Sequence, residues 1–329
     1  MLGPLRIGTD ASEMKRFYLV LLALAATIAA QQAAHAAGAV LVMNSNDATL
    51  SVIDLASQRE LRRIPVLREP HHYALTPDGR DLLVGDTVGN ELFDLDPATF
   101  EIRRQVPVAD PYQLGFSPDA KYLVVNGLAR AQVDVYDPAT YKLVKRFKLP
   151  SMPSHLAFAP DSSAVYVSLQ GTGKLAAIDL RRMEVRWETP IGPAPAGVLW
   201  QNGRVLVAIM GSDDVAVLDP ADGRVESRIR TGRGAHQLFR SPDEKLIYVN
   251  NRVDGTSVAL DAATLKPVRT YKLPGGPDDI QFAPDGKVWF TLRFVNKVAV
   301  LDPASGDYQT IDVGRSPHGI FLNPRAAVH

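Results

Sequence analysis

The sequence SPDAKYLVVNGLARAQVDVYDP, residues 117–138, decides the fold. A Pro-Asp turn at 118–119 precedes an apolar run at 122–126, and a second run at 132–136 ends at Asp137-Pro138. Both runs are short, rich in β-branched and aromatic residues, and bounded by Gly, Asn, Asp and Pro, which is typical of β-strands. The stretch therefore predicts two neighbouring strands and the turns beside them.

The same landmarks return at a regular spacing along the chain. A Pro-Asp turn recurs with Pro at 77, 118, 160, 242 and 284, and Asn202-Gly203 takes its place once. Units of about 41 residues, with room for four short strands each, are typical of propeller blades. We expect the repeated Asp residues to build turns. An apolar residue followed by Asp recurs at Asp54, Asp96, Asp137, Asp179, Asp219, Asp261 and Asp302, at intervals of 42, 41, 42, 40, 42 and 41 residues.

The two ends of the chain complement each other. The first unit begins at Val40 without the strand that precedes the Pro-Asp turn elsewhere, and residues 318–322 form such a strand with no unit after it. We therefore predict an all-β, seven-bladed β-propeller with four-stranded antiparallel blades. The C-terminal strand should pair into the first blade, whose other strands lie near 40–43, 50–54 and 60–64, because this pairing removes two exposed sheet edges.

The N-terminal residues have the pattern of an export signal. Two basic residues at 15–16 precede an apolar run at 17–30, and Ala34-His35-Ala36 is a small-x-small cleavage site. We expect residues 1–36 to be a signal peptide cleaved near Ala36, with Met14 as an alternative start, and residues 37–329 to be a single propeller domain in the periplasm. The alternative is an uncleaved N-terminal anchor.

Composition excludes several classes of function. The chain of 329 residues has 36 Lys+Arg against 36 Asp+Glu, and this balance argues against a general nucleic-acid binder. It has no Cys, so disulfides and thiolate metal sites are excluded. The common nucleophile-elbow, P-loop, zinc-protease and dinucleotide motifs are missing from the sequence. We expect a monomer without a membrane span once the signal is removed.

Every histidine of the predicted ring falls at one place in the repeat, where the chain enters the innermost strand. Only His35 and His329 lie elsewhere among the seven histidines of the chain. In a propeller this place lies at the mouth of the central channel, and the ring brings residues of neighbouring blades together there. The positions aligned on the turn Pro are His71, His72, Tyr112, Gln113, Ser154, His155, Ala196, Gly197, His236, Gln237, Asp278, Asp279, His318 and Gly319.

This column predicts a site for a divalent transition metal. Imidazole and carboxylate groups are common ligands of such metals. We expect His155, in blade four, to lie outside the arc, and strand alternation to turn His72 away from the side that His71 takes. The predicted ligands come from four consecutive blades and are His71, His72, His236, Asp278, Asp279 and His318.

Arginines on the same predicted face favour an organic anion as a second interpretation. A guanidinium matches the geometry of carboxylate and phosphate groups. A polar rim without any ligand is the third interpretation. The arginines lie in loops that lead into inner strands, or in or beside loops between second and third strands, and are Arg68, Arg130, Arg233, Arg252, Arg293 and Arg315.

The repeat resembles a known family. Pro-x-x-apolar-x-apolar-x-Pro-Asp-Gly, followed by a strand, an Asn-containing loop and Val-x-Val-x-Asp, is similar to the YVTN-type β-propeller repeat over residues 39–324. This resemblance implies an exported propeller, and such blades serve many functions. His and Arg over the channel also resemble the haem-binding propeller domain of dissimilatory nitrite reductases, which implies a tetrapyrrole ligand. Seven blades instead of eight, and the lack of Cys for cytochrome c attachment, depart from that second family.

The sequence thus predicts a periplasmic binding or scaffold protein with a His/Asp-rich ligand site at the channel mouth. Two alternatives stay open at this point. One is a metal-dependent oxidoreductase or hydrolase that uses the His/Asp arc, and the other is a binder of an anionic cofactor such as a tetrapyrrole. The expected partner is a small ligand or another periplasmic protein.

Overall fold

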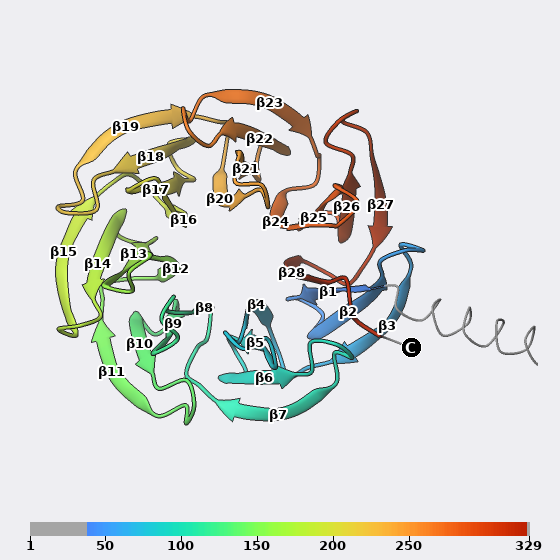
Figure 1. The fold of residues 1–329 in the computed structure, drawn as a ribbon, viewed down its shortest axis with the longest axis horizontal. Helices are drawn as coiled ribbons and strands as arrows, with labels where there is room; N and C mark the ends of the chain where they lie inside the picture. The colour runs from blue at the N-terminus through green and yellow to red at the C-terminus, as the bar shows by residue number, and fades with distance from the viewer. Residues whose placement is uncertain (1–37, 328–329) are drawn as a thin grey trace, which may run out of the picture.

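The computed structural model describes residues 38–327, and all regular structure within them is β-strand. Twenty-eight strands form seven four-stranded antiparallel sheets, arranged as blades around a central axis (Figure 1). We number the blades in chain order and count the sheet of β28, β1, β2 and β3 as blade 1. The predicted fold class is confirmed.

Each blade has one strand near the axis and three strands stacked outward from it (Figure 1). The innermost strands are β28 (Pro317–Asn323), β4 (Pro70–Leu75), β8 (Gln113–Phe116), β12 (Pro153–Phe158), β16 (Pro195–Gln201), β20 (Ala235–Arg240) and β24 (Pro277–Phe282). The second strands are β1 (Ala39–Asn44), β5 (Leu82–Asp86), β9 (Leu123–Gly127), β13 (Ala164–Leu169), β17 (Arg204–Ile209), β21 (Leu246–Asn251) and β25 (Val288–Leu292). The third strands are β2 (Thr49–Asp54), β6 (Glu91–Leu95), β10 (Gln132–Tyr136), β14 (Lys174–Asp179), β18 (Asp214–Leu218), β22 (Thr256–Asp261) and β26 (Lys297–Leu301). The outermost strands are β3 (Glu60–Pro65), β7 (Ile102–Pro107), β11 (Leu143–Lys148), β15 (Glu184–Pro190), β19 (Val225–Arg230), β23 (Pro267–Lys272) and β27 (Tyr308–Asp312).

The burial of each strand follows from its place in the blade. The second strand β9 is buried along its whole length, because each blade packs between two neighbouring blades. The sequence of such a strand is a continuous apolar run, as in parallel sheets, because both faces of the strand are buried. The outermost strand β7 instead exposes most of its charged residues to solvent. Aromatic side chains such as Phe93 and Trp289 fill the space between blades, and each contributes about 1.5–3 kcal/mol by burial.

The ring closes as the sequence predicts. Strand β28 pairs antiparallel with β1, and Ala39 lies opposite Asn323 and Leu41 opposite Phe321. The innermost strand of blade 1 therefore comes from the C-terminal end of the described chain. The repeated Asp residues build the turns between third and outermost strands: in each blade the carboxylate accepts a backbone N–H two or three residues later.

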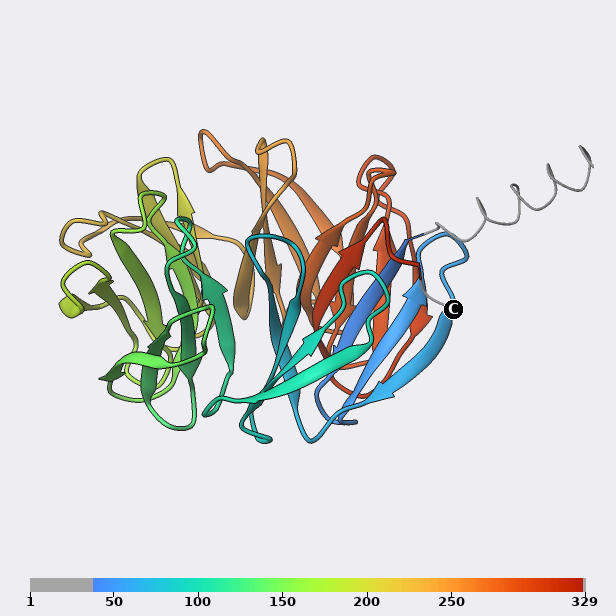
Figure 2. The same ribbon diagram turned by 60° about the horizontal axis from the view of Figure 1, so that its bottom comes forward.

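Strand direction divides the loops between two faces of the ring. The loops that lead into the inner strands, and the loops between second and third strands, lie on one face, which we call the channel face. The Pro-Asp and Asp-Pro turns lie on the other, which we call the turn face. Figure 2 shows the strands running between these two groups of loops. Residues 38–327 contain no helix long and apolar enough to cross a membrane, and the predicted signal peptide lies outside them.

Candidate functional site

The inner strands begin with β-bulges at the positions that carry the histidines. In blade 2, Pro70 pairs with Asp86 and Tyr73 with Val84, so His71 and His72 together oppose the single residue Gly85. A bulge of this kind re-aims side chains and is frequent beside active sites. The ladders of β12, β16, β20, β24 and β28 shift register at the same place.

Side chains of the second strands hold these bulges in place. Thr291 Oγ1 accepts a hydrogen bond from the Asp279 amide at 2.9 Å and donates one to the His318 carbonyl oxygen at 2.8 Å. Asn250 Nδ2 donates to the Asp278 carbonyl oxygen in the next blade at 3.0 Å. The bulged backbone is therefore paired within and between blades, and its side chains project from a rigid frame.

The five histidines of the ring form one cluster at the axis. Ring centroids are 3.6 Å apart for His71 and His318, 4.4 Å for His72 and His318, and 6.2 Å for His236 and His318. His155 lies 5.2 Å from both His72 and His236. All five residues are 1–4% exposed. The sequence predicts that they lie at the mouth of the central channel, and in the structure the inner strands close around the axis and bury them.

One expectation about an individual histidine was wrong, and another stays a prediction. The His155 ring lies in the cluster, but His155 belongs to neither set of potential metal ligands described below, so its place outside the metal-binding arc stays a prediction. His72 is a member as well, and its ring lies 4.9 Å from that of His71. Alternation fails for this pair because the bulge between Pro70 and Tyr73 interrupts the regular strand.

Asp278 is the charged centre beside the cluster. Its fully buried carboxylate accepts hydrogen bonds from Nε and Nη2 of Arg252, at 2.9 Å for Nε, and from Arg293 Nη1 at 3.4 Å. Burial alone would raise the pKa of Asp278, but the two guanidinium groups and His236 outweigh it and hold this pKa well below its usual range. His236 Nδ1 lies 3.0 Å from Asp278 Oδ1, although the ring is not oriented to make this contact a hydrogen bond.

Asp279 has a different environment from its neighbour. Its carboxylate accepts the Ile280 amide hydrogen at 2.8 Å. Burial raises the pKa of Asp279 to about 8, so the group is mostly protonated at neutral pH. Asp279 belongs to neither of the groups of potential metal ligands described below.

The five imidazoles are neutral at physiological pH, and one nitrogen of each ring is unpaired in the described chain. Burial lowers the pKa of His72 to about 3 and that of His236 to about 4, and it lowers the pKa of the other three well below the usual value. One ring nitrogen of each is buried without a hydrogen-bond partner among the described residues: His71 Nδ1, His72 Nε2, His155 Nε2, His236 Nδ1 and His318 Nδ1.

Two sets of three residues bring potential ligand atoms within 4.8 Å of one another. One set is His71, His72 and His318, and the other is His236, Asp278 and His318. His318 is common to both. Neutral imidazole suits zinc, copper, iron and nickel, so the arrangement has the donor atoms of a transition-metal site.

The six predicted arginines lie on the channel face with different partners. Arg252 and Arg293 bind Asp278, Arg233 pairs with Asp254, and Arg315 pairs with Asp47. The side chains of Arg68 and Arg130 are exposed and make no ion pair within residues 38–327, although Arg130 donates to Asn90. These last two guanidinium groups remain available to an anion.

A pocket of about 310 Å³ opens on the channel face between blades 2 and 3. Val88, Tyr112 and Arg130 are among the residues that line it. The Tyr112 ring lies 4.2 Å from that of His71, so a single side chain separates this pocket from the histidine cluster.

Exposed apolar side chains in the channel-face loops are a feature that the sequence interpretation missed. Several follow or precede an arginine directly, as in Leu67-Arg68, Arg252-Val253 and Arg293-Phe294. Phe294 and Val253 are 62% and 61% exposed. These apolar-arginine pairs could have revealed the feature in the sequence. We call this set the apolar rim; it comprises Leu67, Val88, Met152, Val253, Phe294 and Val295.

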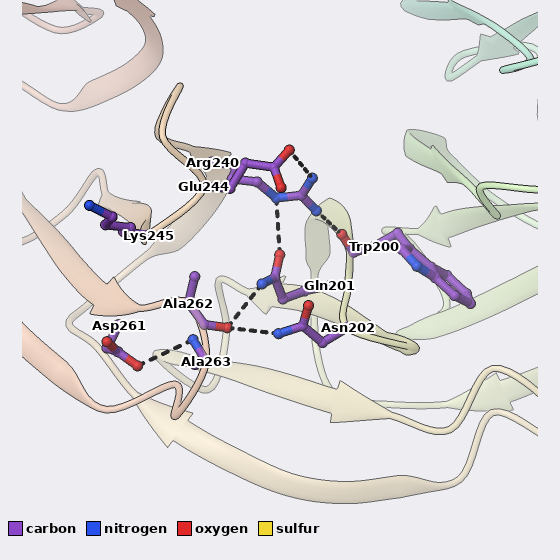
Figure 3. Close-up of a pocket in the computed structure, with 9 residues that line it drawn as sticks. All are labelled: Trp200, Gln201, Asn202, Arg240, Glu244, Lys245, Asp261, Ala262 and Ala263. Atoms are coloured by element: carbon purple, nitrogen blue, oxygen red, sulfur yellow. Dashed lines mark hydrogen bonds and ion pairs between the residues drawn. The ribbon is translucent and has the colours of Figure 1, made fainter.

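A different pocket lies on the turn face, between blades 5 and 6 (Figure 3). Here the short Asn202-Gly203 turn replaces the Pro-Asp turn of other blades. Arg240 Nε donates to Gln201 Oε1 at 3.0 Å, and Gln201 Nε2 donates to the Ala262 carbonyl oxygen at 2.9 Å. The polar groups at this place therefore bind one another across the two blades.

Comparison with known proteins gives one family and several relatives. Residues 18–327 match the YNCE-like beta-propeller family. Protein NirF of Pseudomonas aeruginosa is 25% identical, over 55% of this chain and 51% of NirF, so the chain spans about half the length of this curated relative.

Solved structures share the fold. A functionally unknown protein from Desulfotomaculum acetoxidans has a TM-score of 0.74 at 12% identity, over 86% of this chain and 98% of that one. The periplasmic gluconolactonase PpgL of Pseudomonas aeruginosa has a TM-score of 0.70 at 20% identity, over 87% and 98%. Dihydro-heme d1 dehydrogenase NirN, in complex with DHE, has a TM-score of 0.62 at 16% identity, over 87% and 75%.

Proposed function

This chain belongs to the YNCE-like β-propeller family, and on that premise we propose that it is an exported binding protein for a carboxylate-bearing tetrapyrrole. The ligand would lie over the channel face. The observation that carries the proposal is the coincidence, on this face, of the apolar rim with two unpaired guanidinium groups above a buried imidazole cluster.

The chemistry of the rim matches the two parts of such a ligand. A tetrapyrrole has a flat apolar ring, and burying apolar area contributes about 25 cal/mol per Å² on either partner. Phe294, Val253 and Leu67 offer apolar surface that the fold itself does not bury. The carboxylates of the ligand need cations, and the guanidinium groups of Arg68 and Arg130 make no ion pair in the described chain, although the charge of Arg130 also acts on Asp110 in the wall of the same pocket.

The position of the pocket between blades 2 and 3 also supports a ligand that lies over the channel face. Arg130 and Val88 line the pocket between blades 2 and 3, and its wall Tyr112 contacts His71. A ligand held by its carboxylate at Arg130 would extend over the axis towards Arg252 and Arg293. NirN, which shares the fold, has haem d1 in its name, and this makes tetrapyrroles the first ligands to test.

We also propose that the protein works in the periplasm. The charged, apolar and small-residue pattern of residues 15–36 supports export, and a solved relative of the same fold is described as periplasmic. Fusion of residues 1–40 to a reporter that is active only in the periplasm tests this point.

Titration of the protein with haem and with protoporphyrin IX tests the ligand class. Quenching of the fluorescence of the three Trp residues and the shift of the haem absorption band would measure binding. An exposed charged contact contributes about 1 kcal/mol, so Arg68→Ala and Arg130→Ala should each weaken binding roughly fivefold. The matched control is Arg80→Ala, an exposed arginine in the Pro-Asp turn of blade 2 on the turn face.

The expected result is saturable binding that both channel-face variants weaken and the control does not. Binding that Arg80→Ala weakens as much as Arg130→Ala, or no saturable binding of either compound, would refute the proposal. A second control is haem whose carboxylates are esterified. The wild type should bind this ester more weakly than haem, whereas the double variant Arg68→Ala/Arg130→Ala should bind the ester and haem with equal affinity.

A further inference from the structure

We propose that His71, His72 and His318 form a transition-metal site at the propeller axis, beneath the channel face. The site is distinct from the surface proposed to bind a tetrapyrrole, and it needs no tetrapyrrole to form. Its ligand class is a late first-row divalent ion that prefers imidazole, such as Zn²⁺ or Co²⁺.

Unpartnered nitrogen atoms are the first observation behind the site. His71 Nδ1, His72 Nε2 and His318 Nδ1 are buried without a hydrogen-bond partner in residues 38–327. A buried polar atom left unpaired costs about 1–3 kcal/mol, and folded proteins pair almost all of them. A metal ion bound between the three rings would take one nitrogen from each of them.

Geometry is the second, independent observation. Ligand atoms of the three residues lie within 4.8 Å of one another. A metal–nitrogen bond is about 2.0–2.1 Å long, so two ligands of one ion lie at most about 4.2 Å apart. Three ligands of a tetrahedral ion lie about 3.4 Å from one another, so the three imidazoles need to close by at most about 1.5 Å. They project from bulges that backbone and hydroxyl hydrogen bonds hold in place.

The alternative set with Asp278 is less suitable. Both carboxylate oxygens of Asp278 already bind guanidinium groups, from Arg252 and from Arg293. A metal ion at this carboxylate would have to displace one of these cations or lie beside both. Among the described residues no guanidinium group binds His71 or His72, so a metal ion at these two imidazoles displaces no cation. We therefore assign the ligands to the three-histidine set.

The test uses the mature chain without a His tag, stripped with a chelator and then titrated with Zn²⁺ alone or with Co²⁺ alone. Calorimetry gives affinity and stoichiometry, and the visible spectrum of Co²⁺ reports its coordination by nitrogen. We expect one equivalent to bind. Loss of an outer-shell partner costs roughly 10–100-fold in affinity, so His71→Asn, His72→Asn and His318→Asn should each cost at least that much.

His155→Asn and His236→Asn are matched controls, because both residues are buried in the same cluster but lie outside the assigned set. Both should keep affinity within about threefold of wild type. Circular dichroism checks that every variant is folded. If one ligand variant unfolds, the Co²⁺ spectra of the two control variants still show whether His155 or His236 coordinates the ion. The assignment is overturned if the folded wild type binds neither ion, or if His236→Asn abolishes binding while His71→Asn does not.

Discussion

The ion pairs of Asp278 lead to the most quantitative prediction. Its carboxylate is fully buried, and the guanidinium groups of Arg252 and Arg293 bind it with side chains that are themselves only 17% and 21% exposed. Substituting Asp278→Asn leaves two mostly buried cations without a counter-charge, next to imidazoles that are already without partners. Removing one partner of a buried pair costs about 3–5 kcal/mol.

Urea denaturation and calorimetry would measure this effect. For a domain of this size 1 kcal/mol corresponds to about 2 °C, so Tm should fall by about 6–10 °C. The double variant Asp278→Asn/Arg252→Met should be less destabilised than the sum of its single changes, because the two residues act as one unit. The control is Asp254→Asn, which removes the exposed ion pair with Arg233 on the same face and should cost at most about 1 kcal/mol. An Asp278→Asn variant within 1 kcal/mol of the wild type would refute the reasoning.

Three further predictions follow from the frame of the site. A Cβ at residue 319 would lie 2.6 Å from the His71 carbonyl oxygen, so Gly319→Ala should force β28 from β4 and cost about 1–3 kcal/mol in urea denaturation; an unchanged midpoint would contradict this close approach. Deletion of residues 317–329 removes the inner strand of blade 1 and should yield aggregated protein in size-exclusion chromatography, and a monomeric product with the wild-type Tm would count against closure by β28. Acid should destabilise the metal-free protein: the pKa of His72 is about 3 and that of His236 about 4 when folded, against about 6.5 when unfolded, so the unfolded chain takes up protons first. The free energy of unfolding should be greatest near pH 7 and fall between pH 7 and pH 5, by about 2 kcal/mol for each of His72 and His236, and the lowered pKa values of the other three histidines act in the same sense. Asp279, with its pKa raised to about 8, acts in the opposite sense but is outnumbered, and a urea midpoint that rises on acidification in the presence of chelator would contradict this.

Repetition made the fold predictable. A unit of about 41 residues repeats its apolar-Asp landmark seven times and its Pro-Asp turn five times, and the phase of the two ends is sufficient to predict how β28 closes the ring. The position of the histidines was predictable for the same reason, because equivalent positions of a repeat occupy equivalent places around the axis.

The directions of the side chains were not predictable from this regularity. The expectation for His72 assumed an unbroken strand, and the bulge between Pro70 and Tyr73 has no signature in the alternation of apolar and polar residues. Burial of the cluster depends on how closely the inner strands approach, and this distance depends on glycines such as Gly197 and Gly319, whose substitution would cause contact with the neighbouring strand. The partners of the six arginines depend on loop conformations that the repeat does not encode.

A crystal structure of residues 37–329 grown with haem tests most directly the proposal that the channel face is the binding surface. We predict density for the macrocycle over the apolar rim, in contact with Phe294 or Val253, with a carboxylate at Arg68 or Arg130 and the five imidazoles beneath it. Density for haem on the turn face, such as at the pocket of Gln201 and Arg240, with none on the channel face, would contradict it.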